Sequence, residues 1–157
     1  MLKNIIEQAQ KDWEYHFFMF YCKVLFPFSF AKHFRIVTVD KGIVTRIEVR
    51  HFKNDKNPDL WYIHINLLKP WAWLEKFLRK TNKHRKPNFA YHISWPKNSL
   101  AYKAVTFVND NYLKYPHIYD YNFFVWPNCN TFIQRILNHI PEVKFKLPRN
   151  AIGKNHK

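Results

Sequence analysis

Apolar side chains recur at helical spacing in the first part of the chain, at Leu2, Ile5, Ile6, Ala9 and Trp13. This spacing gathers them on one face of an amphipathic helix over residues 2–15, which we expect to pack on a sheet. Three further helices are predicted: over residues 70–80, from a cap at Asn98 or Ser99 to before Pro116, and over residues 130–139, before Pro141.

Runs rich in β-branched and aromatic residues predict strands between these helices. The most apolar run, residues 17–30, contains Lys23 and Pro27 and is only about half as long as a membrane-spanning helix, so we interpret it as a core strand. The predicted strands are residues 17–25, 34–39, 43–49, 60–65, 90–95 and 121–125. The pattern indicates an α+β fold, an antiparallel sheet with packed helices, in one domain over residues 1–157. Residues 1–16 form its N-terminal helix and residues 17–155 its core.

The turn between the second and third strands sets their register. A two-residue turn of Lys41 and Gly42 is typical of a β-hairpin. In that register His33 lies opposite Arg50 and diagonal to Glu48 on the same face. His33 and Glu48 are therefore expected within reach of each other.

Composition removes several classes of function. The 157 residues include only two glycines, which excludes a glycine-rich phosphate loop, and no cysteine, histidine or carboxylate spacing is typical of a metal site. We expect no cofactor and no metal. Two cysteines do not make a disulfide framework, and residues 1–16 lack the pattern of a signal peptide. We therefore expect a protein without a transmembrane segment that is cytoplasmic, or exported without a recognisable signal peptide.

The net charge of +15 predicts attraction to polyanions such as nucleic acid or an anionic membrane surface. Trp71 and Trp73 are candidate exposed aromatic contacts, or else core residues. The alternative is that the charge has no function, and the Lys, Asn, Ile and Phe enrichment of an AT-rich genome explains part of it. The densest basic run gives the candidate anion-binding residues Lys76, Arg79, Lys80, Lys83, Arg85 and Lys86.

The candidate chemistry centres on Cys129, which the pattern places where a strand turns into a helix, with Asn128 as the predicted cap. Helix N-termini favour anions and lower the pKa of a thiol. His33 is the candidate general base and Glu48 the residue that orients it. The alternatives are that Cys129 is a small buried apolar residue and that Glu48 simply pairs with Arg35.

The run Trp126-Pro127-Asn128-Cys129-Asn130-Thr131-Phe132 and the segment from Ile140 to Asn155 resemble a bacterial family, domain of unknown function 3750. Phe30-Ala31-Lys32-His33 and Arg46-Ile47-Glu48-Val49 are similar to two of its strands. The family often has serine where Cys129 stands, which implies either an interchangeable nucleophile or a structural cap.

The order of histidine strand, acidic strand and helix-start cysteine also resembles circularly permuted papain-like domains of the NlpC/P60 and lecithin-retinol-acyltransferase type. That resemblance implies a cysteine hydrolase or acyltransferase acting on an amide, ester or thioester bond of an acyl or peptide substrate. In this hypothesis Cys129 attacks, His33 is base and then acid, and Glu48 orients His33. Asn128, Asn130 and Thr131 would support the substrate and the oxyanion. The alternative is a non-enzymatic basic module that binds nucleic acid or anionic lipid.

Overall fold

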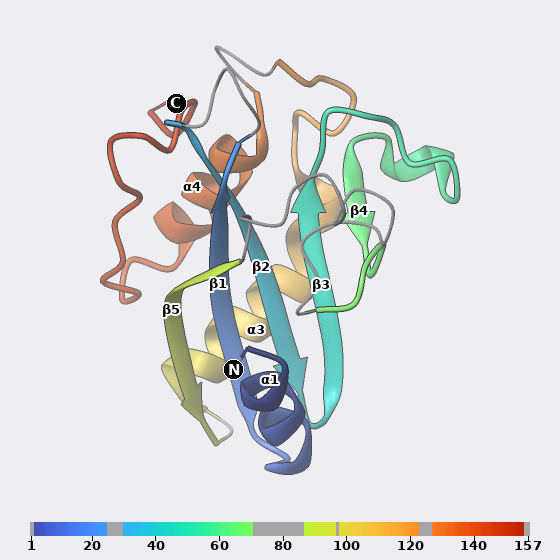
Figure 1. Cartoon of the computed structure of the whole chain (residues 1–157). Helices are drawn as coiled ribbons and strands as arrows, with labels where there is room; N and C mark the ends of the chain where they lie inside the picture. Colours follow the sequence, from blue (N-terminus) through green and yellow to red (C-terminus); the bar gives the residue numbers. More distant parts are fainter. Residues whose placement is uncertain (1, 25–29, 71–86, 97, 123–126, 156–157) are drawn as a thin grey trace.

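The computed structural model describes residues 2–24, 30–70, 87–96, 98–122 and 127–155. It is an α+β fold with one antiparallel sheet in the order β4-β3-β2-β1-β5. Helix α1 covers one face of the sheet, and α3 and α4 cover the other (Figure 1). The strands are β1 Tyr15–Lys23, β2 Lys32–Asp40, β3 Ile43–Val49, β4 Ile63–Ile65 and β5 Asn88–Trp95. The helices are α1 Leu2–Lys11, α3 Leu100–Asn111 and α4 Cys129–His139, with 3-10 turns at Pro58–Leu60 and Tyr112–Lys114.

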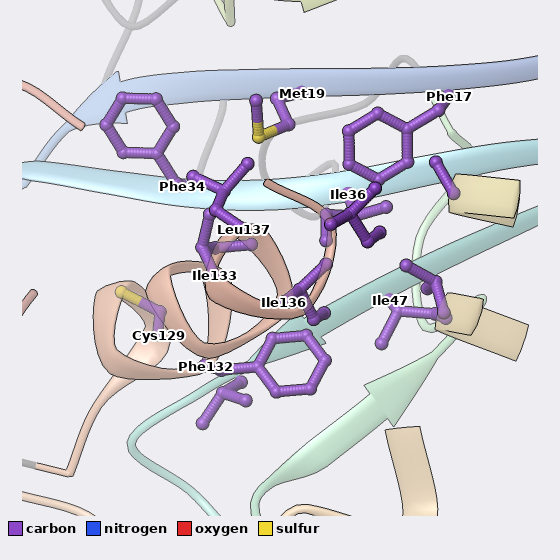
Figure 2. Packing of buried hydrophobic residues seen from close by; sticks show 14 of the residues in the cluster. Phe17, Met19, Phe34, Ile36, Ile47, Cys129, Phe132, Ile133, Ile136 and Leu137 are labelled. Atoms are coloured by element: carbon purple, nitrogen blue, oxygen red, sulfur yellow. The ribbon is translucent and has the colours of Figure 1, made fainter. Parts of the chain in front are cut away.

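Alternation along the strands divides the core into two parts. In β1, Phe17 and Met19 point toward α3 and α4, whereas Phe18 and Phe20 point toward α1. Because both faces are covered, β1 is almost continuously apolar, as the sequence predicted. The larger core lies between the sheet and α3 with α4, and Figure 2 shows part of its packing.

The predicted hairpin is confirmed. Asp40 pairs with Ile43, and the register continues to Ile36 opposite Ile47. Lys41 has φ of 45° and Gly42 has φ of 85°, the left-handed conformations that such a two-residue turn requires. The hairpin therefore places the β2 and β3 side chains as the sequence predicted.

Other element predictions needed correction. The first helix ends at Lys11 rather than residue 15, and Trp13 follows in a left-handed conformation. Within the predicted strand 60–65 only Ile63–Ile65 is a strand, because the chain first makes a 3-10 turn at Pro58–Leu60. At the start of the predicted strand 121–125, residues 121 and 122 are irregular, and the rest lies outside the described residues, as does the predicted helix with Trp71 and Trp73.

No helix in the described part of the chain is long and apolar enough to cross a membrane. Within the same residues, no group of three or more histidine, cysteine or carboxylate side chains is placed to hold a metal ion.

Candidate functional site

The start of α4 is fixed by a capping box. The side chain of Asn128 accepts hydrogen bonds from the backbone N–H groups of Asn130 at 2.9 Å and Thr131 at 3.3 Å. In return, the backbone N–H of Asn128 donates to Thr131 Oγ1 at 3.2 Å. Asn128 thus has the capping role that the sequence predicted, and its carboxamide occupies N–H groups at the start of the helix.

The next residues tie three segments of the chain together. Asn130 Nδ2 donates to the carbonyl oxygens of Lys32 at 2.8 Å and Ile152 at 2.9 Å, and Asn130 Oδ1 accepts from the Phe34 N–H at 3.2 Å. Thr131 Oγ1 donates to the Gly153 carbonyl at 2.8 Å. These side chains therefore anchor the C-terminal segment to α4 and to the start of β2.

Cys129 lies at the first position of α4 and is 5% exposed. It belongs to the larger core with Phe34 and Ile133 (Figure 2). Burial raises the pKa of its thiol to about 12, and the charge of Glu48 adds to this shift. The expected lowering by the helix N-terminus is outweighed, because an apolar interior disfavours the thiolate more than the nearby N–H groups favour it.

His33 and Glu48 are brought together as their register predicted. His33 Nε2 lies 3.7 Å from Glu48 Oε2, and Glu48 Oε1 lies 2.9 Å from Arg46 Nη2 and 3.1 Å from Arg50 Nη2. Burial opposes ionisation of Glu48, but Arg46, His33 and Arg50 together hold its pKa well below the usual range. Burial also lowers the pKa of His33. The pair is an oriented imidazole beside an ionised carboxylate.

Cys129 lies next to the start of β2, where the backbone N–H of Phe34 reaches its thiol and the charge of Glu48 acts on it. Phe34, Ile36 and Ile47 point toward the core that contains Cys129. His33 and Glu48 alternate with these residues along β2 and β3, so their side chains leave the opposite face of the sheet. Cys129 is thus part of the larger core, whereas the side chains of the pair leave the other face of the sheet.

The predicted anion-binding residues, Lys76, Arg79, Lys80, Lys83, Arg85 and Lys86, lie outside the described residues. A second basic surface was missed. Lys23 pairs with Lys32 where β1 ends and β2 begins, and the backbone N–H of Lys32 donates to the Asn150 carbonyl at 2.9 Å. The C-terminal segment, which carries cations of its own, therefore runs beside the end of β1 (Figure 1). We call these cations the C-terminal basic end: Lys23 and Lys32 lie where the two strands meet, and Lys144, Lys146, Arg149 and Lys154 lie on the C-terminal segment.

Acidic residues gather at the other end of the same strands. Asp12 and Glu14 precede β1, and Asp40 pairs with Tyr15 at its first residue. In contrast, residues 16–36 and 143–155 contain no aspartate or glutamate. The sequence signal was the lack of acidic residues in two separate segments, and only the fold puts those segments side by side.

The fold and site define an α+β domain in which a capped helix start holds the C-terminal segment against an antiparallel sheet. The chain belongs to the family described as protein of unknown function (DUF3750), whose model matches residues 25–156. No curated protein and no solved structure matches the chain.

Proposed function

We propose that this protein binds nucleic acid through the C-terminal basic end. The separation of charge along the sheet carries this proposal, since the cations at the end of β1 lie in segments free of acidic residues. Such a surface attracts phosphates and releases their counterions. An aromatic contact is also available there, because Phe30 is 61% exposed and its carbonyl accepts from Asn150 Nδ2.

The placement of exposed apolar residues favours nucleic acid over a membrane. A peripheral membrane site needs apolar side chains next to its cations. Phe30 is such a side chain at the C-terminal basic end, but the more exposed Trp13, Ile43 and Trp95, at 73%, 70% and 65%, lie at the acidic end of the sheet. The pairing of Trp95 with Tyr15, and of Ile43 with Asp40, establishes that position.

The test is a salt titration of binding to a fluorescent single-stranded oligonucleotide, measured by anisotropy. Lys144 and Lys146 are exposed and flank Phe145, which packs against Phe34 and Tyr91. The double variant Lys144→Gln/Lys146→Gln should lower affinity and reduce the slope of log K against log salt by about 1.4, the value for two lost phosphate contacts on a single strand.

The matched control is Lys11→Gln/Lys41→Gln, which removes the same charge from exposed lysines at the acidic end. It should leave the slope nearly unchanged. Equal losses in the two double variants would mean general attraction rather than a site. Stronger binding of anionic vesicles than of the oligonucleotide would replace nucleic acid by a membrane.

A second candidate function is the Cys–His hydrolase or acyltransferase of the permuted papain-like type. The observation that favours it is the 3.7 Å approach of His33 to Glu48, which supplies an oriented base. Catalysis by Cys129 then requires its buried thiol to reach the His33 imidazole. The test is the rate of Cys129 alkylation by iodoacetamide against pH in Cys22→Ser and in Cys22→Ser/His33→Ala. An apparent pKa well below about 8.5 that rises without His33 supports the enzyme, whereas an unreactive Cys129 rejects it.

A further inference from the structure

The other cysteine lies on the face of the sheet that carries His33. In the register of β1 and β2, Cys22 is directly opposite His33. Side chains directly opposite each other in antiparallel strands share a face, with Cβ atoms about 4.5–5.5 Å apart. Cys22 also alternates with Tyr21, whose ring packs on Phe34 in the larger core. The fold therefore brings Cys22 beside the His33–Glu48 pair.

The surroundings of Cys22 are rich in positive charge. Arg35 and Arg46 are fully buried, and Arg46 and Arg50 both contact Glu48. Arg35 is close enough to Cys22 that a thiolate there raises the pKa of the guanidinium. Guanidinium groups next to a cysteine stabilise its thiolate and oppose the effect of burial, which favours the thiol, whereas at Cys129 the charge of Glu48 acts in the same direction as burial.

We propose that Cys22, His33 and Glu48 form an activated thiol site on the α1 face of the sheet. The Cys22 thiol donates to the Lys23 carbonyl at 3.0 Å in the structure. In the proposed reaction it turns from that carbonyl and transfers its proton to His33, Glu48 stabilises the resulting imidazolium, and the sulfur reacts as a thiolate with small neutral electrophiles. With a haloacetamide the sulfur–carbon bond forms, the carbon–iodine bond breaks and iodide leaves, while His33 retains the proton. This site is independent of nucleic-acid binding.

Because Cys22 is 1% exposed, the first measurement is one that needs no reagent. Thiolate ultraviolet absorbance is followed against pH in Cys129→Ser, where Cys22 is the remaining thiol. The expected midpoint is below about 8.5. In Cys129→Ser/His33→Ala it should rise by about one pH unit, a tenfold loss of thiolate at a pH below both midpoints. The matched control, Cys22→Ser, should show no thiolate step below about pH 9, as expected for Cys129.

The second measurement checks the pair from the imidazole and keeps the test valid if His33→Ala does not fold. The His33 ring is titrated by NMR in Cys129→Ser and in Cys129→Ser/Cys22→Ser, and loss of the Cys22 thiolate should lower its pKa. A Cys22 midpoint at or above about 8.5, or a His33 titration unchanged by Cys22→Ser, overturns the proposal.

Discussion

Gly153 gives the sharpest test of how the C-terminal segment is held. Its φ is +86°, and a Cβ added to it would lie 2.7 Å from both Cγ and Oδ1 of Asn128, the residue that caps α4. In Gly153→Ala the left-handed backbone costs about 1–2 kcal/mol. Displacement of the Asn128 cap costs about a further 1 kcal/mol. We expect a loss of about 2–3 kcal/mol in the free energy of unfolding.

The assay is urea unfolding followed by circular dichroism, with Gly42→Ala as the matched control. Gly42 has a similar φ of +85°, but an added Cβ would meet only the Gln10 carbonyl oxygen at 3.0 Å. The control should lose mainly the backbone part. In an Asn128→Ala background, Gly153→Ala should cost about 1 kcal/mol less than in the wild type. If Gly153→Ala costs no more than Gly42→Ala, or if its cost is unchanged in Asn128→Ala, the reasoning is refuted.

Three further predictions concern the two faces of the sheet. Asn130→Ala should lose about 3 kcal/mol or more of stability in urea, because it leaves one buried and two partly buried backbone groups without their partner. Exposed Asn138→Ala on the same helix should lose under about 0.5 kcal/mol, and equal losses would contradict the anchoring role. Above about pH 9 the Cys129 thiol ionises in the unfolded state, whereas in the folded state it stays protonated up to about pH 12. The contribution of Cys129 to the free energy of unfolding should therefore fall by about 1.4 kcal/mol for each pH unit of increase. The difference in stability between wild type and Cys129→Ser should show this decline, and a difference that does not change with pH would exclude it. Glu48→Gln should lower the free energy of unfolding by about 3–5 kcal/mol at neutral pH, because it leaves the Arg46 guanidinium buried without its carboxylate. In the wild type, the stability that Glu48 contributes should be lost as the pH falls from about 4 through the lowered pKa of the folded state. A thermal midpoint that changes neither with the substitution nor with this fall in pH would show that Glu48 does not compensate the Arg46 charge.

Local signals accounted for most of the secondary structure. The Lys41-Gly42 turn predicted the hairpin register, and that register predicted the contact between His33 and Glu48. The cap at Asn128 was also visible, because an asparagine before an apolar helix satisfies the first N–H groups wherever the helix packs. Each of these features depends on residues that are near in sequence or joined by one tight turn.

Local signals did not predict how distant segments of the chain pack together. The sequence selected Cys129 from the properties of a helix start, but these properties say nothing about which face of the sheet the helix covers. α4 packs on the face of Phe34, so the thiol is buried in apolar surroundings, while the neighbouring residue His33 points to the α1 face with Cys22. Because side chains alternate between the two faces of a strand, the adjacent residues His33 and Phe34 point to opposite faces of the sheet.

The sequence by itself determined the fold class, the hairpin and the capped start of α4, because periodicity, turn residues and capping act over a few positions. Only the tertiary structure decided that Cys129 is buried, that Cys22 faces His33, and that Lys23 and Lys32 join the cations of residues 143–155. These outcomes depend on which faces pack together, and packing is decided by contacts between segments more than 90 residues apart, as between Phe34 and Asn130.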